Sequence, residues 1–244
     1  KYYKDGVLAE TVAGGSNETA KTAAATVSVN SSLINTTNKY AGYKFQVTDP
    51  SPVPGSFTAA AGAESVTYTI NVYYVKDTDN THSVSVQVEY YYGDTLALAE
   101  GKTTADYVGD VQTTTTWIGE TATVTAAPNT TDKFTGYSYN TTVGGLSYEV
   151  NAFAATDTTI HIVKVYYVKD TEIKHSVSAQ VEYYFGDTLT AAKAKTTPDA
   201  ADAVQTTTTW IGETATVTVA PDTAKYTGYT YAETIGDLSY TAAA

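Results

Sequence analysis

The sequence predicts a mainly β protein built from three tandem copies of one small module. The same motifs return at a fixed interval, and the composition favours strands over helices. Val88–Leu96 returns as Val181–Leu189, and Gln112–Thr125 returns as Gln205–Thr218, both at an offset of 93 residues. Motifs that keep one register over such a distance indicate a repeat architecture.

The repeats divide the 244-residue chain into three predicted domains. The first repeat covers residues 1–77, the second 81–170 and the third 174–244. Each is of a size that can fold around its own core. The second repeat is complete. The third lacks an equivalent of the closing strand that we expect around Ile162–Asp170.

The first repeat has diverged from the other two and lacks their leading strand. Tyr2–Gly6 aligns with Glu89–Gly93, and Asn35–Tyr43 aligns with Asn129–Tyr137. The first repeat has no counterpart of the Thr-Thr-Thr-Thr-Trp block that ends at Trp117 in the second repeat. Positions shared by all three repeats are therefore expected to specify the fold. The block found only in the last two is where we expect a function beyond scaffolding.

Composition and charge exclude several classes of partner. The net charge is −12 and arginine is absent, which argues against nucleic acid and anionic membrane surfaces. Without cysteine there is no disulfide and no thiolate metal site. No apolar run is long enough to insert this segment into a membrane. Threonine makes up about a fifth of the chain and there are 22 tyrosines, and both residues favour strands.

Alternating apolar residues predict individual strands. In Val84–Tyr92 the even-numbered residues face the core, which places Tyr91 on the outer face. Val66–Tyr74 and Ala122–Ala126 alternate in the same way. The best candidate for a helix is a short one within Leu96–Tyr107. Each module is therefore expected to be a small twisted sheet with at most one short helix.

Three short motifs carry a resemblance to known repeat families. The opening Tyr-Tyr-x-x-Gly is followed by a central Gly-Tyr-x-Tyr/Phe and a closing Val-Tyr-Tyr-Val-Lys-Asp; the central motif lies at Gly42–Phe45, Gly136–Tyr139 and Gly228–Tyr231, and the closing one at Val72–Asp77 and Val165–Asp170. These motifs resemble the mucin-binding-protein (MucBP) repeats and the related Listeria–Bacteroides internalin-type B repeats of bacterial surface proteins. The resemblance implies a β-grasp (ubiquitin-like) fold, a Gram-positive cell-wall protein, and a stalk or adhesive role toward host glycoprotein. It implies no particular ligand-binding residue.

The links between the repeats are short. They cover Asp77–Thr81 and Asp170–Lys174. Short links favour an elongated rod of domains placed end to end. The predicted fold is therefore a rod of three β-grasp domains, and Ig-like β-sandwich repeats are the alternative.

The sequence offers no constellation typical of an enzyme. No carboxylate pair, Ser/His/Asp set or phosphate-binding glycine loop recurs between the repeats, so we predict that the protein is not an enzyme. The histidines are scattered. His82 and His175 are expected to be ordinary polar surface residues, and His161 to be a strand residue at the margin of a sheet.

Aromatic residues on the strands form a candidate glycan-binding set, because flat rings stack on sugars while threonine hydroxyls bond to them. The candidates are Tyr91, Trp117, Tyr137, Tyr139, Tyr184, Trp210, Tyr229 and Tyr231. The alternative is that these rings pack the core and neighbouring strands.

A calcium ion at the first link is a second hypothesis. Asp77, Asp79 and Asn80 place oxygen ligands together where two repeats meet. Ile173 replaces Asn80 in the second link, and a turn rich in Asp and Asn needs no metal to explain it. No other cofactor is predicted.

A self-made amide crosslink is a third hypothesis, between lysine and asparagine or between threonine and glutamine. Gln112 and Gln205 are repeat equivalents. The reaction would require a protonated acid in an apolar pocket beside them.

These observations predict the extracellular repeat region of a cell-wall-anchored bacterial adhesin. It would act as a stalk and contact mucin-type host glycans, with the neighbouring repeats as its other partners. The alternative is a subunit of a self-assembling extracellular filament. Open sheet edges in the first and third repeats would then be completed by strands of neighbouring chains.

Overall fold

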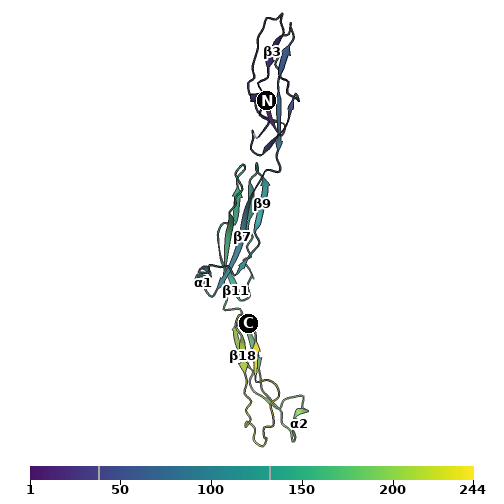
Figure 1. The fold of residues 1–244 in the computed structure, drawn as a ribbon. Coiled ribbons are helices and arrows are strands. Elements are labelled where there is room, and N and C mark those ends of the chain that lie inside the picture. Colours follow the sequence, from purple (N-terminus) through teal and green to yellow (C-terminus); the bar gives the residue numbers. More distant parts are fainter. Residues whose placement is uncertain (38, 132) are drawn as a thin grey trace. The chain divides into compact units, whose positions relative to one another are not determined.

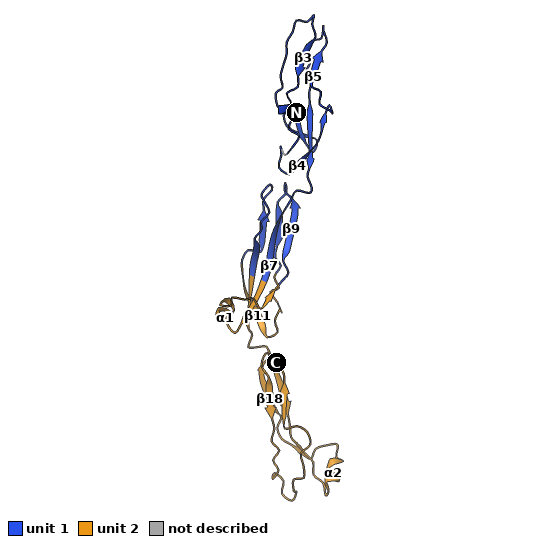
Figure 2. Ribbon diagram, in the orientation of Figure 1, with its two compact units in different colours: residues 1–88, 109–127, 144–163 blue, residues 89–108, 128–143, 164–244 orange. Residues whose placement is uncertain are grey.

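The structure is a computed structural model that describes residues 1–37, 39–131 and 133–244. Asn38 and Asp132, which face each other in the alignment of the first two repeats, lie outside the described residues. The chain is mainly β, with several small sheets and two short α-helices among the described residues (Figure 1). It divides into two compact units, and the boundary between them runs through the second repeat, part-way along strand β7 (Figure 2).

The main sheet of the first repeat is organised around a central strand, which is the last strand of that repeat. Its elements are β1 (Tyr2–Lys4), β2 (Val7–Glu10), β3 (Ala25–Ser28), a 3-10 turn (Ser31–Leu33), β4 (Tyr43–Asp49), β5 (Ser56–Ala59) and β6 (Asn71–Lys76). The main sheet has the order β2-β1-β6-β4, and β3 pairs separately with β5. β6 runs parallel to β1 and antiparallel to β4. Its Val72 and Tyr74 are buried in the core with Tyr2.

The second repeat has the same plan with more strands. Its elements are β7 (Thr81–Gly93), α1 (Leu96–Glu100), β8 (Tyr107–Val108), β9 (Gln112–Trp117), β10 (Ala122–Thr125), β11 (Tyr137–Val143), β12 (Ser147–Val150) and β13 (Ile160–Lys169). The five-stranded sheet has the order β11-β13-β7-β8, with β9 also paired to β7. β10 pairs with β12. β13 is again central, and its Val163, Val165 and Tyr167 are fully buried.

The third repeat contains smaller sheets. Its elements are β14 (Lys174–Ala179), β15 (Glu182–Tyr183), α2 (Leu189–Lys193), β16 (Ala200–Ala201), β17 (Gln205–Trp210), β18 (Ala215–Thr218) and β19 (Ser239–Ala242). They form three two-stranded sheets, β14-β17, β15-β16 and β18-β19. The segment Tyr229–Ile235, which corresponds to β11, is not a strand. Ala179, Val217 and Val219 form a buried cluster in this repeat.

Most of the alternation predicted from the sequence is confirmed. In β7, Val84, Val86, Val88 and Tyr90 are buried, and in β10 Ala122 and Val124 are buried. The helix predicted within Leu96–Tyr107 is present but ends at Glu100. Thr95 starts it, because its hydroxyl accepts the Leu98 N–H.

Three expectations were wrong. The strand expected from Val66 begins at Asn71, and Tyr68 is largely exposed. Tyr91 is 3% exposed although the alternation places it outside, because α1 and Tyr166 cover that face of β7. His82 was expected at the surface but is 1% exposed. For Tyr91 and His82, contacts from outside the local strand pattern decided the burial.

The alignment of the first repeat with the second is also wrong by one residue. The Tyr2 hydroxyl accepts the Asn35 N–H at 2.9 Å, and the Tyr90 hydroxyl accepts the Asn129 N–H at 2.9 Å. Because Asn35 and Asn129 are equivalent, Tyr2 corresponds to Tyr90 rather than to Glu89.

A second tyrosine completes this contact from the central strand. The Tyr74 hydroxyl donates to the Asn35 carbonyl oxygen at 2.5 Å, and the Tyr167 hydroxyl donates to that of Asn129 at 2.6 Å. The backbone N–H of each asparagine is thus bound by a tyrosine of the opening strand, and its carbonyl oxygen is bound by a tyrosine of the closing strand.

We expect Tyr74→Phe to lower the free energy of unfolding of the first repeat by about 1–2 kcal/mol, because it leaves a part-buried carbonyl without its partner. Tyr73→Phe is the matched control. The Tyr73 ring stacks on Tyr3, and the change leaves that stack in place. We expect its cost to stay within about 0.5 kcal/mol. Urea denaturation measures both, and equal effects would contradict the role of the Tyr74 hydroxyl.

Candidate functional site

The Thr-Thr-Thr-Thr-Trp block forms an outer strand that ends on its tryptophan. β9 pairs antiparallel with the start of β7, and Trp117 lies opposite Thr81. β-branched threonines favour this extended backbone. Directly after the strand the indole lies across Gly119, where an added Cβ would come within 2.1 Å of the ring. The glycine is therefore required by the close approach of the ring to the backbone.

Within the first compact unit, Trp117 of the second repeat contacts the first repeat. Its indole N–H donates to the Gly42 carbonyl oxygen at 3.0 Å. The Tyr43 ring meets the indole edge to face, with 5.4 Å between the ring centres. Gly42 has φ +76° and is buried, and a Cβ there would lie 3.0 Å from the indole. The indole thus packs directly on a backbone position that only glycine fits.

A lysine and a glutamate complete the contact. The Lys76 ammonium lies 4.3 Å from the centre of the Trp117 ring, within range of a cation–π interaction. The same ammonium lies 2.9 Å from a Glu120 carboxylate oxygen, and the Thr116 hydroxyl donates to the other oxygen at 3.0 Å. Lys76 and then Thr116 lower the pKa of Glu120 below its ordinary value.

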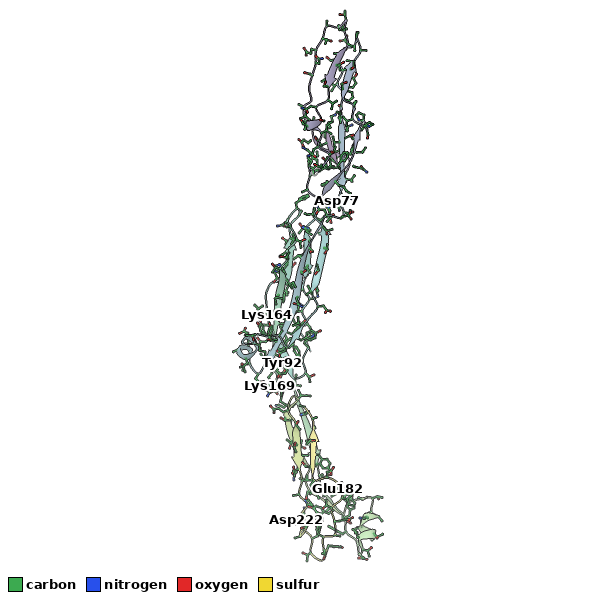
Figure 3. All side chains as sticks on the ribbon, in the orientation of Figure 1. Asp77, Tyr92, Lys164, Lys169, Glu182 and Asp222 are labelled. Atoms are coloured by element: carbon green, nitrogen blue, oxygen red, sulfur yellow. The ribbon has the colours of Figure 1, made fainter. Side chains whose placement is uncertain are left out.

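The second compact unit contains the same arrangement between the second and third repeats. The Trp210 indole N–H donates to the Gly136 carbonyl oxygen at 3.2 Å, and the Tyr137 ring lies edge to face at 5.4 Å. Figure 3 labels Lys169, which belongs to this joint. Its ammonium lies 4.2 Å from the centre of the Trp210 ring and 3.1 Å from a Glu213 carboxylate oxygen. We call these two clusters the tryptophan joints. The same five residue types build both of them.

The histidines of the leading strands stabilise the loop that carries each glutamate. The His82 ring nitrogens lie 2.7 Å from the Glu120 carbonyl oxygen and 3.0 Å from that of Ala154. His175 makes the equivalent contact with the Glu213 carbonyl oxygen at 2.6 Å. His161 lies in β13 as expected, stacked on Tyr148 and bonded to Asp157.

The predicted glycan-binding residues fall into different environments. Trp117, Trp210 and Tyr137 are part of the joints, with a lysine over each indole. Tyr91 is buried against Tyr166 and presents no face to a ligand. The other four rings are exposed: Tyr139, Tyr184, Tyr229 and Tyr231.

Two of the predicted calcium ligands pair with a lysine. The Lys44 ammonium lies 3.1 Å from Asp77 and 3.7 Å from Asp79, so a side chain supplies positive charge to both carboxylates. Asn80 donates its backbone N–H to the Asp77 carbonyl oxygen, as in an ordinary turn. In the described part of the chain, no group of three or more His, Asp or Glu side chains is placed to hold a metal ion.

The glutamines considered for a crosslink are exposed. Gln112 and Gln205 begin β9 and β17, with their side chains in solvent. An amide-forming crosslink requires an acid in apolar surroundings, and these two exposed positions do not provide such surroundings.

Comparisons with family models, with curated proteins and with solved structures found no match to this chain. The assignment of a role therefore depends on the geometry of the joints. None of the helices in the described residues has the length and apolarity to cross a membrane.

Sequence reasoning identified the tryptophans but missed their partners. Gly42 and Trp117 are 75 residues apart, and no local pattern links them. One signal was available: the tryptophan block occurs in the two repeats that follow another repeat in this sequence.

The joints should weaken in acid. The pKa values of Glu120 and Glu213 are lowered by their lysines, so each ion pair contributes fully above the ordinary glutamate pKa and is lost as the pH falls through the lowered value. We expect tryptophan fluorescence to change reversibly below about pH 4, ahead of unfolding. The double variant Glu120→Gln and Glu213→Gln should lack this transition. A transition of unchanged size in the variant would assign it to other groups.

Proposed function

We propose that this chain is the stalk region of an extracellular, cell-wall-anchored bacterial adhesin, in which successive β-grasp repeats are coupled by the tryptophan joints. The observation that carries the proposal is that one joint geometry occurs twice. A tryptophan of one repeat packs on the glycine, tyrosine and lysine of the repeat before it. A stalk requires this kind of repeated coupling between neighbours.

The motifs that resemble MucBP and internalin-type B repeats supply one side of each joint. Gly42 and Tyr43 belong to the central Gly-Tyr motif, and Lys76 belongs to the closing Val-Tyr-Tyr-Val-Lys-Asp motif. The motifs therefore have a role in coupling one repeat to the next. This gives the resemblance a physical basis in a tandem array.

The sheet of the first repeat supports the β-grasp assignment over the Ig-like alternative. Its first and last strands, β1 and β6, are parallel neighbours in the centre of an otherwise antiparallel sheet. A β-grasp fold contains such a pair, whereas an Ig-like sandwich is built from antiparallel sheets.

The adhesive part of the proposal rests on the exposed rings. Tyr139, Tyr229 and Tyr231 are 39%, 55% and 49% exposed and are available to stack on mucin-type glycans. Threonine hydroxyls lie beside two of these rings: that of Thr142 is 3.2 Å from the Tyr139 hydroxyl, and that of Thr234 is 3.1 Å from the Tyr231 hydroxyl.

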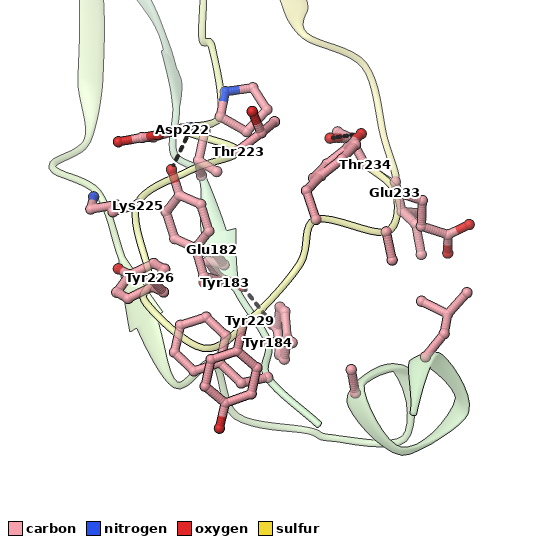
Figure 4. A pocket seen from close by; sticks show the side chains of 18 of the residues that line it. Glu182, Tyr183, Tyr184, Asp222, Thr223, Lys225, Tyr226, Tyr229, Glu233 and Thr234 are labelled. Carbon is pink, nitrogen blue, oxygen red and sulfur yellow. Dashed lines mark hydrogen bonds between the residues drawn. The ribbon is translucent and has the colours of Figure 1, made fainter. Parts of the chain in front are cut away.

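The second candidate function is the filament subunit with strand exchange between chains. The observation that favours it is a cleft in the third repeat, which is lined by β15 and by the irregular segment Tyr229–Ile235 (Figure 4).

The stalk proposal can be tested on the joint of the first unit. The chain has no cysteine, so spin labels at Gln46→Cys and Thr123→Cys report one distance, from β4 of the first repeat to β10 of the second. We expect a narrow distance distribution that Trp117→Ala broadens. The same change should cost about 2–3 kcal/mol of stability, somewhat less than for a fully buried tryptophan.

Trp210→Ala is the matched control, because it removes the same residue type from the other joint. It should leave the distance between these two labels unchanged. A distribution in the unaltered protein as broad as that of Trp117→Ala would contradict a coupling role for the joint, and with it the stalk.

The location can be tested on the bacterium that makes the protein. Antibodies against this chain should label intact cells, and brief protease treatment of those cells should remove the label. Labelling that requires permeabilised cells would contradict an extracellular stalk.

A further inference from the structure

The threonine block of the second repeat forms the outer strand of its sheet. β9 pairs antiparallel with β7 and with no second strand among the described residues (Figure 1). Its side chains Thr113 and Thr115 are exposed. In the third repeat β17 likewise pairs with β14 and with no other strand in the part that the structure describes. An open edge of this kind can pair with a further strand.

The hydrogen-bond register shows which backbone groups of β9 lie on its free side. The Ile118 N–H donates to the Asn80 carbonyl oxygen just beyond the end of the strand pair. Hydrogen-bonded pairs alternate along an antiparallel ladder, so Thr114 also bonds to β7. The N–H and C=O groups of Thr113 and Thr115 therefore point away from β7, toward the free side.

This edge is uncharged although the chain as a whole is strongly acidic. The net charge is −12, so two copies of the chain repel each other over most of their surface. No charged residue occurs from Val111 to Gly119, and Glu120, which follows, is paired with Lys76. Natural proteins commonly protect an exposed edge with a lysine or a proline, and β9 has neither. Two copies can therefore approach at this edge without bringing like charges together.

Hydroxyl pairs across neighbouring strands already occur in this chain. The Thr26 and Thr58 hydroxyls lie 2.9 Å apart across the β3-β5 pair. Those of Ser85 and Thr113 lie 2.8 Å apart across the β7-β9 pair. Cross-strand pairs of this kind stabilise a sheet. A second strand of threonines is therefore a chemically matched partner for β9.

We propose that β9 and β17 are self-association edges, at which two copies of this protein pair strand to strand through their threonine blocks. The partner of β9 is β9 of the second copy, in antiparallel orientation. In the register that keeps threonine opposite threonine, Thr113 lies opposite Thr115 of the second copy, and Thr115 lies opposite Thr113. The interface then uses the same strand on both copies, as in a two-fold dimer, and the backbone bonds extend the sheet. β17 offers the same edge for the same contact.

This contact is additional to the tryptophan joints, which couple repeats within one chain, and it does not depend on the stalk role. No strand leaves its own repeat, so the contact also differs from strand exchange in a filament. Each strand contributes six residues, far fewer than the roughly 20 on each side of a stable interface. We therefore expect weak association, with a dissociation constant on the order of 100 µM.

Analytical ultracentrifugation over a range of protein concentrations tests the association. We expect the 244-residue protein to shift from monomer toward dimer between about 10 µM and 1 mM. Added salt should strengthen the association, because it screens the repulsion between two acidic chains. The amides of Thr113 and Thr115 should gain protection from hydrogen exchange as the concentration rises, whereas that of Thr114 should be protected at every concentration.

The double variant Thr115→Lys and Thr208→Lys places a charge at both edges. Both threonines are exposed, so the fold should be retained. We expect association at least about tenfold weaker, although the change makes the chain less acidic. The matched control is Thr130→Lys with Thr223→Lys, which adds the same charges at equivalent exposed positions outside the strands. It should associate at least as strongly as the unaltered protein.

A protein that stays monomeric up to about 1 mM would overturn the proposal. A dimer in which the amides of Thr113 and Thr115 remain unprotected would also overturn it, because the interface would then lie elsewhere. Equal association of the two double variants would have the same meaning.

Discussion

The position of the closing strand between two neighbours is the constraint on which the rest of each repeat depends. β6 and β13 pair on both sides, and they bury Val72 and Tyr74, or Val165 and Tyr167, in the core. A central strand satisfies its backbone groups within the sheet, which a buried strand requires. The tyrosine hydroxyl of the same strand fixes the asparagine loop on the opposite side of the core. One segment therefore organises both the sheet and the loops.

The same strand links the fold of one repeat to the next repeat. It ends on Lys76 or Lys169, and that lysine covers the tryptophan of the following repeat. The exposed ion pair to glutamate contributes little by itself. Most of the coupling comes from the indole ring, which packs on glycine and donates to its carbonyl oxygen. A repeat therefore presents a complete contact surface to its successor when its own closing strand is in place.

The sequence predicted burial correctly in strands where one face alone packs on the core. The period of two in β7 and β10 follows from burial of one side of a sheet, so Val84, Val86 and Val124 could be assigned. Tyr91 could not, because a helix turn bearing Ala99 covers the second face, and alternation carries no information about a two-sided strand. The partners of the two tryptophans could not be predicted from the sequence either, because tertiary packing between repeats brings them together.

The glycine of the central Gly-Tyr motif differs in burial between the repeats. Gly42 and Gly136 are buried under an indole, whereas Gly228, their equivalent in the third repeat, is exposed. The joints explain the Gly-Tyr motif at both positions, because the positive φ and the nearby indole each require glycine at Gly42 and Gly136. The tyrosine that follows each glycine meets the same indole edge to face.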